Sequence, residues 1–171
     1  MNAERDFLIR EAQKNDLEAI LAINNYVIQT STSNYDWDIK ELAWQKNWFQ
    51  EKQTGNWPVF VVESEGRTVG FGTYGPFRLK QGYAKTVEHT IYIAEGFQSK
   101  GFGGALLEQL INTATKNGFH IMIAGIDADN DRSISFHQDH GFETVALFKE
   151  VGFKFNRWLD LVFMQLDLSR E

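Results

Sequence analysis

The chain has 171 residues, of which 43% are hydrophobic and 14% aromatic, a composition that suits a folded domain and excludes a disordered chain. The formal net charge of −6, from 17 basic and 23 acidic residues, argues against general binding to nucleic acids or anionic membranes. The absence of cysteine excludes disulfides, a thiolate nucleophile and cysteine-based zinc sites.

The first elements in chain order are a strand and two helices. The apolar run 7–9 predicts the strand. Asn15, with Glu18 three residues later, forms the pattern of a capping box and predicts the start of the first helix. Asp38 and Glu41 repeat that pattern and predict the start of the second helix.

The middle of the chain reads as strands. Residues 59–63 and 68–74 predict a hairpin with its turn at Glu65-Gly66. Residues 86–93 alternate buried-type and polar side chains, as a half-buried strand does. A loop that contains several glycines follows at 96–104.

The remaining segments complete an α/β pattern. They predict a helix over 106–114 that ends at Asn117-Gly118, a buried strand over 121–126, a helix over 133–140 that ends at Gly141, and strands over 143–149 and 159–168. The order is therefore β-α-α-β-β-β-α-β-α-β-β. This order predicts a mixed α/β sheet with helices on both faces, in a single domain spanning 1–171.

The N-terminus lacks the basic start and apolar run of a secretory signal. Apolar stretches also stay short of the ~18 residues that span a bilayer. We therefore expect a soluble cytoplasmic protein with no membrane or nucleic-acid partner.

The segment 98–105, Gln-Ser-Lys-Gly-Phe-Gly-Gly-Ala, lies between a predicted strand and a predicted helix. Gly101, Gly103 and Gly104 let the backbone bend so that its N–H groups face a ligand at a helix N-terminus, which favours phosphate. Lys100 would add a positive charge. The alternative is a strand-to-helix turn without a ligand, and the segment matches neither the P-loop nor the dinucleotide motif.

Two patterns resemble the GNAT superfamily of N-acetyltransferases. The first is Gln98-x-x-Gly101-x-Gly103-Gly104-Ala105, which is similar to the pyrophosphate loop of that superfamily. The second runs from Asn130 to Phe142, as Asn-x-x-Ser-x-x-Phe-His-x-x-x-Gly-Phe, and is similar to its downstream motif.

Three further segments resemble one branch of the superfamily, the phosphinothricin and methionine sulfoximine acetyltransferases. They are residues 86–93, residues 126–130 and residues 152–161. The resemblance extends from Ile9 to Leu166.

The resemblance implies an acetyltransferase fold in which two neighbouring parallel strands splay apart, so that the pantetheine of acetyl-CoA pairs with their free backbone groups. It implies acetyl-CoA as co-substrate, no metal, and a homodimer. The residues implied for coenzyme binding are Ile91, Tyr92, Ile93, Gln98, Ser99, Lys100, Gly101, Phe102, Gly103, Gly104 and Asn130.

The chemistry needs a group that accepts the proton of the acceptor amine, directly or through water. Glu88 is the candidate, with a solvated carboxylate at a strand end as the alternative. A carboxylate has an ordinary pKa of about 4.3, so burial or a water relay must help it. A backbone N–H near Ile91 is the candidate donor to the oxyanion.

Histidines give a second set of candidates. His137 stands where many superfamily members carry a tyrosine that protonates the departing thiolate, and it either acts as that acid or packs and contacts the coenzyme. His89 should face the opposite side of the strand from Glu88, as a core or supporting residue. His120 and His140 are expected at the surface or in packing, with no metal-ligand spacing.

The acceptor site is implied by the resemblance to lie beside the loop 75–80. The residues implied for acceptor binding are Arg78, Leu79, Lys80, Tyr83, Glu88, His89 and Thr90. A guanidinium can grip a carboxylate or phosphinate with two bonds, and the alternative is an exposed basic loop. Tyr35 and Trp37 either wall this site or belong to the core, and the core interpretation is preferred.

The sequence therefore predicts an enzyme that moves an acetyl group from acetyl-CoA onto a small amino acid-like amine by direct attack in a ternary complex. One alternative is a non-catalytic acyl-CoA-binding module, and another is an acetyltransferase for a protein or peptide amine. The apolar segment 158–161 packs within a strand or faces a second copy of the chain, and the pattern does not separate these two roles.

Overall fold

The computed structural model of the protein describes residues 7–169. Its elements within that range confirm the predicted order and add two short 3₁₀ turns. They are β1 (Phe7–Glu11), η1 (Lys14–Asp16), α1 (Leu17–Thr30), α2 (Leu42–Thr54), β2 (Val59–Ser64), β3 (Arg67–Pro76), η2 (Gln81–Tyr83), β4 (Thr86–Ile93), α3 (Phe102–Lys116), β5 (Ile121–Asp127), α4 (Asp131–Asp139), β6 (Glu143–Lys154) and β7 (Arg157–Asp167).

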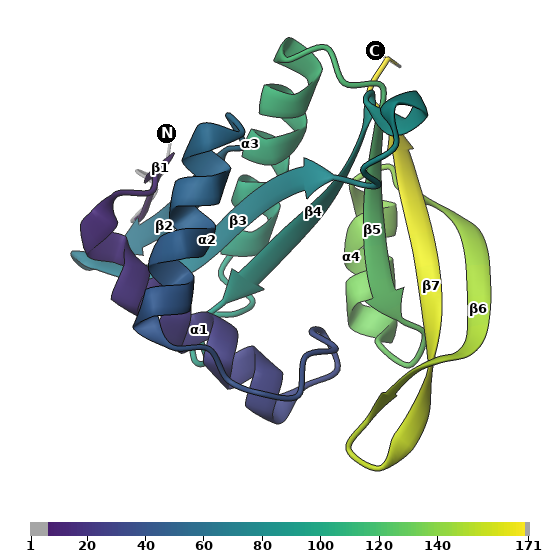
Figure 1. Cartoon of the computed structure of the whole chain (residues 1–171), viewed down its shortest axis with the longest axis horizontal. Coiled ribbons are helices and arrows are strands. Elements are labelled where there is room, and N and C mark those ends of the chain that lie inside the picture. The colour runs from purple at the N-terminus through teal and green to yellow at the C-terminus, as the bar shows by residue number, and fades with distance from the viewer. Residues whose placement is uncertain (1–6, 170–171) are drawn as a thin grey trace. The chain divides into compact units, whose positions relative to one another are not determined.

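The strands form one mixed sheet in the order β1-β2-β3-β4-β5-β7-β6 (Figure 1). β1 pairs antiparallel with β2, β2 with β3, β5 with β7, and β6 with β7. β4 and β5 are parallel, and their pairing joins Thr86–Glu88 to Ile121–Ile123. The mixed α/β class predicted from the sequence is thus confirmed.

The described chain divides into two compact units. Unit 1 contains the residues up to Tyr26, Lys40–Tyr74 and Thr90–Leu110, and unit 2 contains Val27–Ile39, Gly75–His89 and the residues from Ile111 onward. Helices α1 and α3 and strands β3 and β4 each run from one unit into the other.

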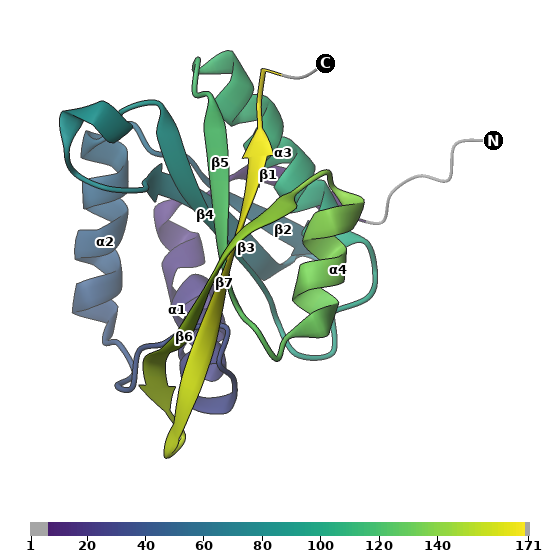
Figure 2. The ribbon, with the colours of Figure 1, turned by 90° about the vertical axis from the view of Figure 1, so that its right-hand side faces the viewer.

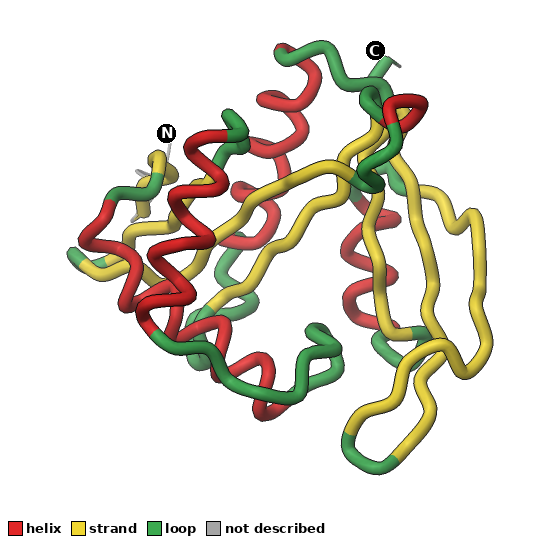
Figure 3. The backbone as a smooth tube through the Cα atoms, in the orientation of Figure 1, coloured by secondary structure: helices red, strands yellow, loops and turns green. Residues whose placement is uncertain are grey.

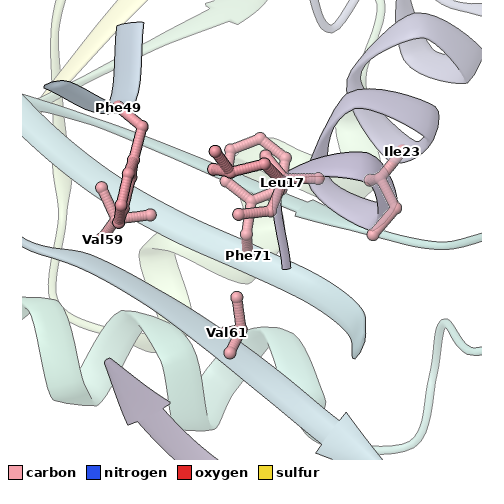
Figure 4. Packing of buried hydrophobic residues seen from close by; sticks show 7 residues of the cluster. Leu17, Ile23, Phe49, Val59, Val61 and Phe71 are labelled. Atoms are coloured by element: carbon pink, nitrogen blue, oxygen red, sulfur yellow. The ribbon is translucent and has the colours of Figure 1, made fainter. Parts of the chain in front are cut away.

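Unit 1 is built around apolar side chains of α1, α2, β2 and β3 (Figure 4). Phe71 on β3 belongs to this cluster, whereas the next residue, Gly72, faces Leu106 and Leu110 of α3. A Cβ at Gly72 would lie 3.1 Å from Leu110 and 3.3 Å from Ile91, so the missing side chain lets the helix approach the strand. Because successive residues of β3 face opposite sides, α1 and α2 pack on one face of this strand and α3 packs on the other, within unit 1.

Both predicted helix caps differ from the structure. Asn15 lies inside η1, and Asp16 supplies the cap instead, because its Oδ2 accepts a bond from the Gln13 backbone N–H at 2.7 Å. The N-cap position of α2 is Glu41, so a cap at Asp38 is wrong by three residues. Polar residues in the sequence predict that a helix begins nearby. Which residue occupies the cap position also depends on contacts with the rest of the fold.

Unit 2 contains α4, which packs against β5, and the antiparallel hairpin of β6 and β7. Figures 2 and 3 show this hairpin as two long strands joined by a short loop. β6 extends to Lys154, five residues beyond the strand predicted from the sequence. Register shifts between Thr144 and Ala146 and between Phe148 and Gly152 break the alternation, which explains the early end of the prediction.

Within residues 7–169, no helix combines the length and apolar content that a membrane crossing requires.

Candidate active site

Glu88 is a half-buried residue of β4, in register with Ile123 of β5. Burial raises the pKa of its carboxyl group, and the positive charge of Arg78 opposes that rise. A Cβ at Gly125 would lie 3.1 Å from Glu88 Oε1 and 3.2 Å from the Phe163 ring, so this glycine leaves room for the carboxylate. A carboxylate whose pKa is raised in this way is a stronger base than a solvated one, which suits a group that accepts a proton.

Arg78 lies on the loop before β4, over two aromatic rings. Its guanidinium carbon is 5.2 Å from the Phe77 ring centroid and 5.9 Å from that of Tyr83. Phe77 in turn contacts Phe163, with ring centroids 5.8 Å apart. Because Phe163 pairs with Gly125, these contacts connect Arg78 to the sheet face that carries Glu88.

The other predicted acceptor residues of this loop are exposed. Leu79 has 92% of its surface accessible, and Tyr83 has 40%. Lys80 is also exposed and, like Arg78, forms no ion pair with any residue in the described range. The basic loop thus keeps two cationic groups available to a ligand, and Thr90, further along β4, is half-buried.

His89 lies on the opposite face of β4 from Glu88, as predicted. It is 9% exposed, and its ring stacks on His137 of α4 with centroids 5.1 Å apart. Phe142 contacts both rings. The ring therefore faces away from Glu88. This position favours the prediction of His89 as a supporting residue over the prediction that it contacts the acceptor.

The hydrogen bonds of the two imidazoles assign their protons. His137 Nδ1 lies 2.7 Å from the carbonyl oxygen of Ser133, which only accepts, so Nδ1 carries the proton. Burial lowers the pKa of His137, and burial with the nearby His137 lowers the pKa of His89 to about 3. With both rings neutral, the tautomers that satisfy these contacts have His89 Nε2–H donating to His137 Nε2 at 3.1 Å, and His89 Nδ1 then has no partner within residues 7–169.

The glycine loop lies in unit 1 and leads directly into α3, which begins at Phe102. Ser99 and Gly101 have φ angles of 63° and 81°, in the left-handed region. The backbone N–H of Ala105 bonds to Gly101 O at 3.1 Å, the first bond of the helix, so Gly103 and Gly104 occupy the first turn. N–H groups in that turn lack intrahelical acceptors and can bind an anion.

The other residues predicted to bind the coenzyme differ in whether their side chains are accessible to a ligand. The Phe102 side chain is 6% exposed and packs on Phe7, so only its backbone is available. Tyr92 packs its ring on Phe71, while its neighbours Ile91 and Ile93 are half-buried. Gln98 Nε2 donates to Ile93 O at 3.4 Å, and the Lys100 ammonium lies 4.9 Å from the ring of Phe97.

Asn130 is the N-cap of α4, in unit 2. Its side-chain oxygen accepts a bond from the Ser133 backbone N–H at 3.0 Å. The side-chain amide nitrogen then remains as a donor for a ligand. The described residues include no cluster of His, Asp or Glu that could hold a metal ion.

Tyr35 and Trp37 do not belong to the core, so the preferred interpretation is wrong. Trp37 is 66% exposed, and its indole N–H donates to Phe153 O at 2.9 Å. Tyr35 is half-buried against β6, with its hydroxyl 3.5 Å from Asp160 O. Aromatic residues in a polar loop give no sign of whether they cover a hairpin or enter a core.

Sequence reasoning also missed residues that shape this site. Phe77 and Phe163 link the basic loop to the sheet, and Gly125 makes space for Glu88. Gly125 had a detectable signal, because a glycine inside an otherwise apolar strand often marks a close approach. The aromatic pair had none, because its two members are far apart in the chain.

Comparison with known proteins supports the resemblance. The acetyltransferase (GNAT) domain family matches residues 9–163. An L-methionine sulfoximine/L-methionine sulfone acetyltransferase from Pseudomonas aeruginosa (strain PAO1) is 38% identical over 162 residues, 94% of each chain.

Two solved structures extend the comparison. A phosphinothricin acetyltransferase from Sinorhizobium meliloti, in complex with acetyl-CoA, is 32% identical with a TM-score of 0.91, over 95% of this chain and 88% of that one. A ribosomal-protein-alanine N-acetyltransferase from Brucella melitensis is 39% identical with a TM-score of 0.92, over 94% and 99%. Since a family model matches most of the chain and close relatives span nearly all of it, this protein belongs to the GNAT family of acetyltransferases.

Proposed function

We propose that the protein transfers the acetyl group of acetyl-CoA to the amine of a small amino acid-like acceptor, of the phosphinothricin or methionine sulfoximine type. The observation that carries the proposal is the half-buried Glu88 carboxylate, whose pKa is raised by burial, on the sheet face linked to Arg78. A proton acceptor and an anion-binding guanidinium together suit a zwitterionic amino acid. The names of the relatives support the same class of acceptor.

The coenzyme would be held by backbone groups. We propose that the first-turn N–H groups of α3 and the residues Gln98 to Gly104 bind the pyrophosphate, with Lys100 as the nearby positive charge. The β4 backbone at Ile91 and Ile93 would pair with the amides of pantetheine, and the amide nitrogen of Asn130 would donate to the same arm.

The reaction would proceed in one ternary complex. Glu88, directly or through water, takes a proton from the acceptor ammonium, and the amine nitrogen attacks the thioester carbonyl carbon. The C–N bond forms, the oxyanion is stabilised by a backbone N–H near Ile91, and the C–S bond then breaks. As the intermediate collapses, its nitrogen gives up its second proton, which passes directly or through water to the CoA thiolate, so the products are the amide and the CoA thiol. Because the amine attacks acetyl-CoA itself, no covalent enzyme intermediate arises.

For His137 we propose the packing and positioning role. Its Nδ1 proton is engaged by the Ser133 carbonyl, and its Nε2 accepts from His89, so the neutral ring has no free proton to donate. A thiol with an ordinary pKa of about 8.5 can leave without strong help from an acid.

A protein or peptide amine is the second candidate acceptor, because the relative from Brucella melitensis carries the name of a ribosomal-protein-alanine N-acetyltransferase. A peptide acceptor requires an open groove beside the loop 75–83. A small acceptor requires only the ion-binding groups already described.

We also propose one cytoplasmic domain that forms a homodimer through the β6–β7 hairpin. The single domain is supported by the four elements that run from one unit into the other. The dimer is supported by the place of β6 at one end of the strand order and by the exposed apolar residues of the hairpin, which are Val145, Leu147, Phe148, Val151, Phe155 and Trp158.

The test of the function is thiol release from acetyl-CoA with a panel of amino acid analogues, amines and N-terminal peptides. We expect Glu88→Gln to lower kcat by about 10²–10⁴-fold while acetyl-CoA binding stays unchanged. Glu108→Gln, on an exposed position of α3, is the matched control and should keep full activity. Unchanged kcat in the Glu88 variant would remove this residue as the proton acceptor, and release with peptides alone would favour the second candidate.

A further inference from the structure

The segment 152–154 of β6 belongs to a motif that the proposed reaction does not use. It contacts the loop 31–37, which follows α1 and carries Tyr35 and Trp37, and both segments lie in unit 2. Each of the three residues of the segment contacts a different part of that loop.

Lys154 bonds to the start of the loop. The residue is 4% exposed, and its ammonium donates to Ser31 O at 2.8 Å and to Asn34 O at 2.5 Å. Two backbone carbonyls accept the protons of this buried lysine, and the negative charge of Asp36, in the same loop, also favours its charged form. The Ser31 carbonyl follows the last turn of α1, where a positive charge is favoured by the helix dipole.

Gly152 determines where the Tyr35 ring can lie. A Cβ at this position would overlap the ring, with Tyr35 Cδ2 only 2.8 Å away. Ring carbons cannot yield as the end of a flexible side chain can, so any other residue would displace Tyr35. Phe153 lies between Gly152 and Lys154 in the chain. Its carbonyl oxygen accepts a hydrogen bond from the indole N–H of Trp37, and the rings of Phe153 and Trp37 have centroids 6.1 Å apart.

The position of Tyr35 matters because of its neighbours on β5. The Tyr35 hydroxyl lies 3.5 Å from Asp160 O, which also accepts the backbone N–H of Ala128 at 2.9 Å, directly after the end of β5. Burial raises the pKa of Tyr35 to about 12, and Asp127 adds to that rise. Asp127 is two residues beyond Gly125, and by strand alternation both face the side that carries Glu88. Tyr35 therefore lies beside the end of β5, the strand on which Asp127 shares a face with Gly125 and with the carboxylate of Glu88.

We propose that Gly152 and Lys154 are positioning residues that fix the loop 31–37, and that Tyr35, held in this way, limits the size of the acceptor side chain. The inference rests on the proposed function, since it assigns a boundary to the acceptor site of that enzyme. Both residues act through Tyr35 and need no contact with acetyl-CoA.

The first measurement tests the positioning without any use of activity. Chymotrypsin cleaves after aromatic residues, and Tyr35 and Trp37 provide two cleavage sites in the loop. We expect Gly152→Ala and Lys154→Met to accelerate cleavage at these sites, identified by mass spectrometry, and Lys154→Arg to restore protection. Lys149→Met, on an exposed lysine of the same hairpin, should digest like the wild type. Cleavage as slow as in the wild type in both test variants would overturn the positioning role.

The second measurement tests the boundary. With the best acceptor of the panel, Gly152→Ala should raise the acceptor KM about tenfold, keep the acetyl-CoA KM, and shift the preference between acceptors of different side-chain size. Faster cleavage with unchanged acceptor KM and unchanged preference would overturn the role of Tyr35. Failure of the wild type to use any acceptor would count against the proposed function, whereas the digestion would still report on the loop.

Discussion

Glu88 and His89 are adjacent in the chain and face opposite environments. Glu88 is half-buried and has the cationic neighbour Arg78, whereas His89 is buried and contacts His137 and Phe142. Burial acts on both, but it raises the pKa of an acid and lowers the pKa of a base. The same strand thus holds a carboxyl group with a raised pKa, which is a stronger base, and an imidazole with a lowered pKa, which stays neutral.

The buried imidazoles make stability depend on pH. The folded-state pKa of His89 is about 3, below its ordinary value of 6.5, so the unfolded chain binds a proton first as the pH falls. The free energy of unfolding should therefore be highest above about pH 6.5 and should decrease as the pH falls toward about 3. Chemical denaturation at a series of pH values measures this slope.

A variant isolates the part of the slope that His89 contributes. His89→Gln keeps a donor to His137 and cannot be protonated, so we expect a flatter dependence between about pH 5 and 6.5. His120→Gln, at a histidine side chain that is 61% exposed, is the matched control for the removal of one imidazole. An identical slope in the His89 variant would contradict the assignment of a neutral, buried ring.

At the scale of elements, the loop before α3 depends on backbone conformation. Gly101 has a φ of 81°, and a Cβ there would meet no atom within 4 Å, so Gly101→Ala changes only the conformational preference. Left-handed φ costs an alanine about 1–2 kcal/mol, and if the loop relaxes, its N–H groups turn away from the coenzyme. We expect the acetyl-CoA KM to rise about 5–30-fold with little change in the acceptor KM.

Gly96 provides the matched control for this change. Its φ is 79°, and the space around its missing Cβ is equally open. Gly96→Ala carries the same backbone strain outside the segment 98–104, so its acetyl-CoA KM should stay at the wild-type value. Equal effects of the two substitutions would mean that Gly101 acts only through the stability of the fold and not through the binding segment 98–104.

The comparison of sequence and structure is clearest for these elements. β4 was predicted with both of its ends correct, because strict alternation from Thr86 to Ile93 is a local property. β6 was predicted too short, because its register shifts respond to β7 and to Tyr35, which no local pattern reveals. Arg78 and Glu88 were identified as candidates from residue type and resemblance, whereas the Phe77–Phe163 contact that links them needed the fold.

At the scale of the molecule, the two ends of the strand order differ. β6, at one end, carries exposed apolar side chains such as Leu147, and β1, at the other end, carries the exposed Leu8. If the proposed homodimer uses the β6–β7 hairpin, Leu147→Asp should convert a dimer to a monomer in sedimentation velocity, because it places a charge in an apolar contact. Leu8→Asp should leave the dimer intact, and equal effects of both changes would contradict the proposed interface.

The alternation of β4 limits the insertions and deletions that this chain can accept. A strand has a period of two, so the loss or gain of one residue just before Glu88 would exchange the faces of every side chain after it. The imidazole of His89 would then replace the carboxylate beside Gly125, and the acid would enter the apolar space under α4. Length changes in the loop 77–85 are therefore compatible with the proposed proton acceptor only if the strand keeps its phase, and the other phase would also bury a carboxylate in apolar surroundings.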